Sequence, residues 1–191
     1  YQKGSLFTGK NYLIYEITIS ILKKFIESER DFVKKGNEII VRGLEMKFYE
    51  AVFIPELNQE IFLKGTIDRI DILNGISRII DYKTGNISSA DLSFKSWEEL
   101  ISLPRKSALF QVMLYAFALK NKLKNDTVYS GVIPLKNFDN QFLAVHQKRG
   151  RIKGPLTIDT DALNDFEEEL FKLLREIFNS NIPFVDKGNK I

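Results

Sequence analysis

The chain of 191 residues is 44% hydrophobic, with 15 Phe and a formal net charge of +3, so it can bury one sizeable core but is too short for two ordinary domains, and we expect a single domain over residues 1–191. The absence of cysteine excludes disulfides, thiolate zinc sites and cysteine-ligated iron–sulfur clusters, and it favours a reducing compartment, the cytoplasm. No apolar run approaches the ~20 residues needed to cross a bilayer, so no membrane partner is expected, whereas a pI of about 8.9 permits a polyanionic partner without requiring one.

Helical spacing opens the chain and strand patterns follow it. Apolar residues recur three and four positions apart up to Gly36, which predicts an amphipathic helix. Leu44, Met46 and Phe48 then alternate with their neighbours as in a half-buried strand. Further on, Asn74-Gly75 is the pair best suited to a type I′ turn and predicts a hairpin. The expected elements are a helix from Thr8 to Lys35 and strands from Glu38 to Ile54, Glu60 to Leu73 and Ile76 to Lys83, with a loop at Pro55 to Asn58.

The second half of the chain is predicted to contain two helices with two strands between them. Its first segment is polar and irregular, and the next is apolar on nearly every side, which suits a helix inside the protein. The expected elements are an irregular segment from Asn86 to Pro104, a helix from Lys106 to Lys122, strands from Thr127 to Leu135 and Gln141 to Gln147, a basic loop from Lys148 to Gly154 and a helix from Asp161 to Phe178. This order predicts an α/β domain with a mixed central β-sheet flanked by helices.

The predicted hairpin places acidic residues side by side. If the turn has the two residues just named, the numbers of paired residues sum to 149 and Asp68 lies opposite Asp81. Side chains alternate by two along a strand, so Lys83 and Thr66 share the face of both carboxylates. Two carboxylates ~5 Å apart repel each other unless a cation offsets them, and magnesium prefers such oxygen ligands. Lys83 could orient a water or steady a phosphate oxygen beside them.

A simpler interpretation is a charged, solvated hairpin face with cross-strand ion pairs, which are common and worth only ~0–1 kcal/mol each. Isoleucines on both sides of the two strands count against it, because they indicate a central hairpin with partly buried carboxylates. Buried carboxylates need partners. The charged residues concerned are Asp68, Arg69, Asp71, Arg78, Asp81 and Lys83.

The hairpin sequence resembles the second and third motifs of RecB-like nucleases in the PD-(D/E)XK superfamily, in the runs Gly65-Thr66-Ile67-Asp68-Arg69-Ile70-Asp71 and Ile79-Ile80-Asp81-Tyr82-Lys83-Thr84-Gly85. Gln111 and Tyr115, four positions apart on the buried helix, match the Gln-x-x-x-Tyr motif that follows in that family. Three motifs in the family's order are a specific signal, whereas a lone Asp-x-Lys is not. The final helix and Ile182-Pro183-Phe184 are similar to the closing part of AddB-type nuclease domains.

The resemblance implies a restriction-endonuclease-like fold and a catalytic Mg²⁺, with Mn²⁺ as a substitute. Asp68, Asp81 and the main-chain carbonyl of Tyr82 would hold the metal, and Lys83 would assist the attacking water. The implied function is hydrolysis of DNA within a larger helicase-nuclease for double-strand break repair and recombination. The implied partners are DNA and a helicase subunit, or a helicase domain of the same chain.

Further site residues have competing interpretations. The resemblance implies that Gln111 and Tyr115 contact the DNA strand, but taken alone they would be a core amide satisfied by backbone and a core aromatic residue. Glu45 is a candidate third metal ligand or an exposed strand glutamate. The basic loop could follow a phosphate backbone or be solvated; its candidate DNA-binding residues are Lys148, Arg149 and Arg151.

The chain departs from RecB-like nucleases in two respects. Their upstream metal-site histidine has no counterpart, since the only histidine, His146, lies downstream and suits a structural role. Their cluster-binding cysteines are absent as well, so no iron–sulfur cluster is expected. Because the chain opens at Tyr1 rather than Met, we expect a fragment of a larger protein; either the histidine segment precedes it or this member has lost that segment, and we expect little or no nuclease activity from residues 1–191 alone. The alternatives are a non-cutting module that binds DNA or a helicase partner, and an unrelated α/β domain with a chance hairpin.

Overall fold

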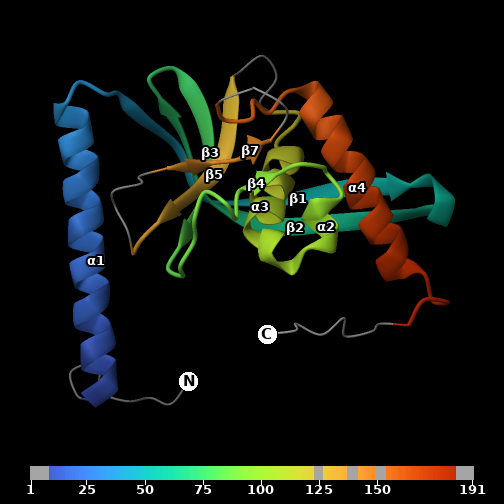
Figure 1. Cartoon of the computed structure of the whole chain (residues 1–191), viewed down its shortest axis with the longest axis horizontal. Helices are drawn as coiled ribbons and strands as arrows, with labels where there is room; N and C mark the ends of the chain where they lie inside the picture. Colours follow the sequence, from blue (N-terminus) through green and yellow to red (C-terminus); the bar gives the residue numbers. More distant parts are fainter. Residues whose placement is uncertain (1–8, 123–126, 137–141, 149–153, 184–191) are drawn as a thin grey trace.

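The computed structural model describes residues 9–122, 127–136, 142–148 and 154–183, which form a mixed sheet flanked by helices (Figure 1). The helices are α1 (Gly9–Lys34), α2 (Glu99–Ser102), α3 (Ser107–Ala118) and α4 (Thr160–Phe178), and 3₁₀ turns span Pro55–Leu57 and Pro104–Lys106. The strands are β1 (Ile39–Ile54), β2 (Gln59–Leu73), β3 (Ile76–Lys83), β4 (Ser93–Phe94), β5 (Val128–Pro134), β6 (Leu143–Ala144) and β7 (His146–Gln147). None of the described helices combines the length and the apolar character needed to cross a bilayer.

The central sheet has the strand order β1-β2-β3-β5-β6. The β1–β2, β2–β3 and β5–β6 pairs are antiparallel, whereas β3 and β5 are parallel and are joined by a crossover that contains α3. This arrangement confirms the predicted mixed sheet flanked by helices. Strand β1 lies at the sheet edge, and its long hairpin with β2 extends past α4 in the view of Figure 1.

The β2–β3 turn is determined by its local sequence. Asn74 and Gly75 have φ angles of 49° and 83°, both positive as a type I′ turn requires. The side-chain oxygen of Asn74 also accepts the main-chain N–H of Glu38 at 2.8 Å, which ties the turn to the start of β1. Leu73 pairs with Ile76 across this turn, so the turn sets the register of both strands.

Helix α3 is buried, as its apolar sequence predicts. The main-chain oxygen of Val112 accepts the hydroxyl of Ser130 on β5 at 2.7 Å, so the helix is hydrogen-bonded to the sheet that it covers. Phe166 of α4 packs against Phe110 and Phe117, with ring centroids 5.6 and 6.1 Å apart. This packing fixes the helix that carries the Gln-x-x-x-Tyr motif.

Helix α1 forms where it is predicted, but its apolar side is not covered. None of its residues is buried, and Leu13 and Ile17 are 59% and 50% exposed. Contact with the sheet comes from its C-terminal half, where the Phe25 ring lies edge-on to Tyr82 with centroids 5.5 Å apart. The helix therefore stands at one end of the molecule (Figure 1).

Two segments differ from the sequence prediction. The span from Asn86 to Pro104 contains β4 and α2, and Lys106, which is buried, donates to the main-chain oxygens of Ala90, at 2.6 Å, and Ser93. The single strand predicted from Gln141 to Gln147 is instead two short strands, since β6 pairs with β5 whereas β7 pairs with β4 in a separate sheet.

The predicted alternation in β1 fails at one position. Met46 and Phe48 are half-buried and buried as expected, but Leu44 is 63% exposed. The β1–β2 register shifts between Val41 and Gly43, and Glu45 has a φ of 48°. The bulge and the left-handed backbone of Glu45 both interrupt the two-residue alternation of side chains. The sequence pattern therefore no longer predicts on which face of the strand Leu44 lies.

Candidate active site

The β2–β3 register agrees with the sequence prediction in all five described pairs, from Leu73–Ile76 to Arg69–Ile80. Pairing by hydrogen bonds ends there, one step before Asp68 and Asp81. At that step the side chain of Asp68 replaces the main-chain acceptor, since its Oδ2 accepts the main-chain N–H of Tyr82 at 2.7 Å. The acids of the two motifs therefore lie where the two strands separate.

Asp81 is buried and pairs with Lys83. Its side chain is 4% exposed, and its Oδ2 lies 2.8 Å from the ammonium of Lys83. Lys83 is therefore the cation that partners the buried Oδ2. Burial raises the pKa of Asp81, the negative charge of Asp68 adds to the rise, and Lys83 opposes it.

Lys83 is held between β3 and α3. Its ammonium donates to Gln111 Oε1 at 2.6 Å, and Gln111 Nε2 donates to the hydroxyl of Tyr115 at 2.6 Å. An ammonium has three N–H donors, and its contacts with Asp81 and Gln111 leave one for a further acceptor. We call Asp68, Asp81 and Lys83 the acidic face of the hairpin, because two carboxylates stand there against one ammonium.

These contacts test the structural interpretations of Gln111 and Tyr115, whereas their contact with DNA stays a prediction. The Gln111 side chain contacts two other side chains, so it is not a core amide satisfied by backbone. Tyr115 is a core residue with a polar tip: it is 7% exposed, and its ring packs against Phe48 with centroids 6.0 Å apart. Burial raises the pKa of Tyr115, and the charges of nearby carboxylates, including that of Glu45, raise it further.

The acidic face has the donor set for a divalent cation. Two neighbouring carboxylates, one of them buried, with one ammonium beside them form an arrangement that a hard cation stabilises. Within the part of the chain that the structure describes, no three His, Cys, Asp or Glu side chains are grouped closely enough to hold a metal by themselves. Glu45 therefore does not complete a triad with the two aspartates, and its assignment as a ligand stays a prediction.

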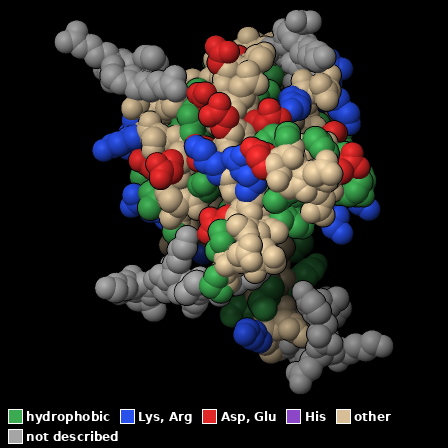
Figure 2. Space-filling model, turned by 90° about the vertical axis from the view of Figure 1, so that its right-hand side faces the viewer, with side chains coloured by type: hydrophobic (Ala, Val, Ile, Leu, Met, Phe, Trp, Pro, Cys, Tyr) green, Lys and Arg blue, Asp and Glu red, His purple; other side chains and the backbone are tan. Residues whose placement is uncertain are grey.

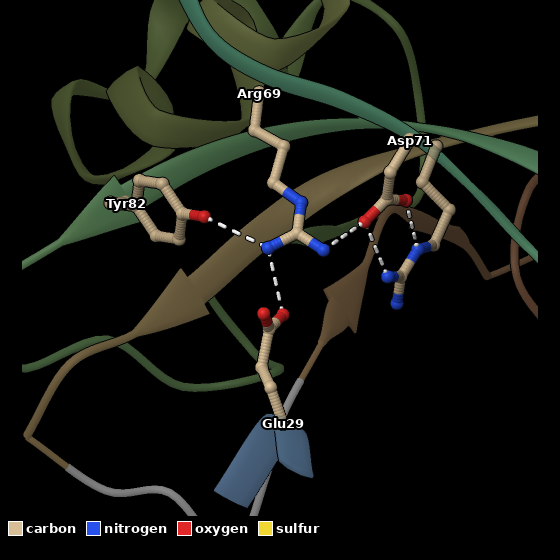
Figure 3. A network of polar contacts seen from close by, with 5 residues as sticks. Glu29, Arg69, Asp71 and Tyr82 are labelled. Carbon is tan, nitrogen blue, oxygen red and sulfur yellow. Dashed lines mark hydrogen bonds and ion pairs between the residues drawn. The ribbon is translucent and has the colours of Figure 1, made fainter. Parts of the chain in front are cut away.

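The opposite face of the hairpin carries a second set of charges (Figure 3). Asp71 accepts two hydrogen bonds from Arg78, both at 2.8 Å, and pairs with Arg69 at 2.7 Å. Arg69 also donates to Glu29 of α1 at 2.7 Å and to the hydroxyl of Tyr82 at 3.2 Å. We call Arg69, Asp71 and Arg78 the ion-pair face.

The ion-pair face is buried, unlike the solvated face of the simpler interpretation. Arg69, Asp71 and Arg78 are 3%, 0% and 5% exposed. Burial alone would lower the pKa of Arg69, but the hydrogen bond to Tyr82 and the carboxylates of Asp71 and Glu29 raise it above its ordinary value. The sequence predicted a central hairpin with partly buried carboxylates and gave cross-strand ion pairs as part of the solvated alternative; the link to α1 was not predicted.

One motif residue has a structural reason that sequence reasoning missed. A side chain at Gly65 would place its Cβ 2.7 Å from the Phe48 ring, so only glycine lets that ring lie against β2. Phe48 in turn contacts Tyr115, which orders the helix side of the site. The signal was present in the glycine that opens the Gly-Thr-Ile-Asp run.

Of the remaining predicted residues, the structure describes Lys148 and His146. Lys148 is exposed, and its main-chain N–H donates to Phe94 O at 2.7 Å. Arg149 and Arg151 lie outside the described residues. His146 is half-buried on β7, and its main-chain N–H donates to Leu92 O at 2.9 Å; the structural role of its side chain stays a prediction.

Comparison with known proteins gives a family and one distant partial relative. The profile of the PD-(D/E)XK nuclease superfamily matches residues 13–189. A 59-residue stretch is 46% identical to an ATP-dependent helicase/deoxyribonuclease subunit of Alkaliphilus oremlandii (strain OhILAs), over 29% of this chain and 5% of that protein. A solved structure described as "Crystal structure of SSO0001" aligns with a TM-score of 0.32 and 15% identity, over 85% of this chain and 59% of that one. This last similarity is too low to support an argument.

Proposed function

Because the chain belongs to the PD-(D/E)XK nuclease superfamily, whose members typically use a divalent metal ion, we propose that it is a metal-dependent deoxyribonuclease domain with its reaction centre on the acidic face. The observation that carries this proposal is the buried Asp81, whose carboxylate lies beside that of Asp68 with the ammonium of Lys83 at 2.8 Å. One ammonium compensates two neighbouring carboxylates only in part, which favours a further cation.

The residues divide the work as follows. Asp68, Asp81 and the main-chain carbonyl of Tyr82 would hold a Mg²⁺ or Mn²⁺ ion, which supplies charge stabilisation and an activated water when bound. Lys83 has one N–H left for that water or for a phosphate oxygen. Gln111 fixes the direction of this N–H, because it holds the ammonium from the side of α3. Tyr115 orients Gln111 and would lie next to the DNA strand together with it.

The larger setting rests on the partial relative. The matched protein is named as part of a helicase/deoxyribonuclease, and the chain spans only 5% of its length. We propose that the chain is the nuclease part of a RecB/AddB-type helicase-nuclease that processes DNA ends for recombination and repair. A helicase subunit, or a helicase domain of the same protein, would then supply the DNA.

Metal binding and cleavage test the proposal separately. Mn²⁺ binding is measured by calorimetry, and cleavage of linear single- and double-stranded DNA is measured with Mn²⁺, with Mg²⁺ and with chelator. Asp68→Ala should abolish metal binding and cleavage, whereas Lys83→Ala should reduce cleavage by about 10²-fold or more with metal binding retained. Glu45→Gln determines whether that residue is a third ligand.

The outcomes distinguish the two proposed roles. Chelator-sensitive cleavage that is lost in Asp68→Ala supports the nuclease. DNA binding with no cleavage, even in the full-length protein that contains this chain, would instead indicate a module that grips DNA without cutting it. Cleavage at wild-type rates in Asp68→Ala would place the reaction centre elsewhere.

A further inference from the structure

The outer face of the β1–β2 hairpin exposes aromatic rings between lysines. Tyr49, Phe53 and Phe62 are 64%, 55% and 49% exposed, and Lys47 and Lys64 are exposed as well. Large aromatic side chains contribute most when they are buried, so several of them on one outer surface indicate a surface that binds something.

Strand pairing brings these side chains together. Tyr49 lies directly opposite Lys64, and Lys47 lies directly opposite Thr66, so alternation by two puts them on one face. The Tyr49 and Phe62 rings stack with centroids 5.0 Å apart and planes inclined by 19°. An open groove of about 420 Å³ lies at the lysine end of this stack; its lining residues are Lys47, Phe48, Tyr49, Lys64, Gly65 and Thr66.

We propose that this aromatic–lysine face (Lys47, Tyr49, Phe53, Phe62 and Lys64) binds single-stranded nucleic acid. Proteins that bind single strands without sequence preference stack bases on exposed aromatic rings and place cationic side chains along the phosphates. The stacked ring pair and the two flanking lysines provide both elements. This binding goes beyond the nuclease function proposed above and does not require cleavage.

Strand β2 continues from this face to the candidate site, with Lys64 and Asp68 about 13 Å apart along the strand at ~3.3 Å per residue. Tyr49 and Lys64 lie on the side of the hairpin opposite Phe48 and Gly65, and Phe48 packs against Tyr115 of the site, so the aromatic–lysine face is a surface separate from the acidic face. Glu60 lies opposite Phe53 at the far end of the hairpin and the lysines lie at the near end, so phosphates are favoured at the lysine end.

An unpaired strand fits this face better than a duplex does. The flat faces of bases are accessible to aromatic rings only where the bases are unstacked. Duplex binding relies on an extended positive surface, but the end of the molecule toward which the hairpin extends shows acidic and basic side chains interspersed (Figure 2). Binding at this end therefore depends on the local arrangement of rings and lysines rather than on a broad positive field.

A protein partner fits less well than nucleic acid. Lysine is depleted in the centres of protein–protein interfaces, whereas Lys64 lies directly opposite Tyr49 in the middle of this face. The paired segments 47–53 and 60–66 present no Leu, Ile or Val on this side, where Lys47, Tyr49, Ala51, Phe53, Glu60, Phe62, Lys64 and Thr66 alternate with the inward residues. The face thus offers rings and cations without a continuous aliphatic patch.

Binding of a labelled oligothymidylate and of a duplex of the same length, measured by fluorescence anisotropy with chelator present, tests the proposal. Tyr49→Ala should weaken single-strand binding by about 5- to 150-fold, the range for loss of one stacked base, and Tyr49→Phe should retain it. Lys47→Gln with Lys64→Gln should make the dependence of log affinity on log salt shallower by about 1.4, the value for two phosphate contacts on a single strand.

Matched controls come from α1, where Tyr12→Ala and the pair Lys23→Gln and Lys24→Gln remove an exposed ring and two exposed lysines elsewhere. These variants should leave single-strand binding unchanged, and duplex binding should respond little to Tyr49→Ala. Unchanged single-strand affinity in Tyr49→Ala, or equal losses in the α1 controls, would overturn the proposal.

The two proposals fail in different ways. Single-strand binding that depends on Tyr49, together with no cleavage by the full-length protein that contains this chain, supports the aromatic–lysine face and counts against the nuclease. Cleavage that persists with unchanged single-strand binding in the Tyr49 and lysine variants overturns the aromatic–lysine face alone.

Discussion

Both faces of the β2–β3 hairpin carry aspartates, but their charges are compensated on the ion-pair face and only partly compensated on the acidic face. On the ion-pair face, Asp71 receives three contacts from two arginines and is fully buried. On the acidic face, two aspartates stand with one lysine, whose ammonium lies 2.8 Å from the buried Asp81. Opposite charges that compensate one another stabilise the fold, whereas uncompensated negative charge favours the binding of a cation. Whether the charge of a carboxylate is compensated by its neighbours, rather than its residue type, therefore indicates whether its role is structural or chemical.

Substituting Asp81, on the acidic face, has the largest expected effect. Asp81→Asn should reduce metal-dependent cleavage by at least about 10²-fold, since even a misplacement near 1 Å costs that much. The metal-free melting temperature should stay the same or rise, because an amide carries no charge into the buried site. Calorimetry and thermal unfolding with and without Mn²⁺ measure this, and Asp31→Asn on α1 is the exposed control. A marked fall in the metal-free melting temperature would make Asp81 a structural residue.

The same substitution on the other face should act with the opposite sign on stability. Asp71→Asn leaves two buried arginines without their shared carboxylate and should lower the free energy of unfolding by about 3–5 kcal/mol. Urea unfolding measures it, against Asp31→Asn, where an exposed pair contributes ~0–1 kcal/mol. If Asp71→Asn and Asp31→Asn unfold alike, the ion-pair face does not stabilise the fold.

Lowering the pH is expected to have the next largest effect, on metal binding at the acidic face. The pKa of Asp81 is raised in the folded chain by burial, so the protonated form favours folding; this contribution is present below the unfolded pKa and is lost as the pH rises through the folded pKa. Mn²⁺ competes with this proton, so its affinity should fall by up to about tenfold per pH unit below the raised pKa. Calorimetry across acid pH checks this. An affinity that does not change with pH would contradict the assignment of Asp81 as a ligand.

The smallest expected effect tests whether the two faces act independently of each other. Tyr82→Phe removes the hydroxyl that accepts from Arg69 at 3.2 Å and should lower the free energy of unfolding by about 0.5–1.5 kcal/mol. Cleavage should be unchanged, because the proposed metal contact of Tyr82 is its main-chain carbonyl. A large loss of activity with an intact fold would show that the two faces are coupled through β3.

The sequence by itself determined the features that depend on neighbouring residues. Asn74-Gly75 specified the turn through its positive φ angles, the turn specified the five-pair register, and alternation then assigned Asp68, Asp81 and Lys83 to a common face. The apolar α3 and the amphipathic α4 follow from spacing alone. Such features are local, so no distant contact was needed to predict them.

The tertiary structure decided what depends on contacts between distant segments. The link between the ion-pair face and α1 depends on the bond of Arg69 to Glu29, 40 positions earlier in the chain, and the orientation of Lys83 depends on Gln111, 28 positions later. The division of the predicted Gln141–Gln147 strand depends on two different sheets competing for its backbone hydrogen bonds. The exposure of Leu44 depends on a bulge against β2. Periodicity in the sequence reports which side of an element is apolar, but which partner covers that side is determined only when the chain closes on itself.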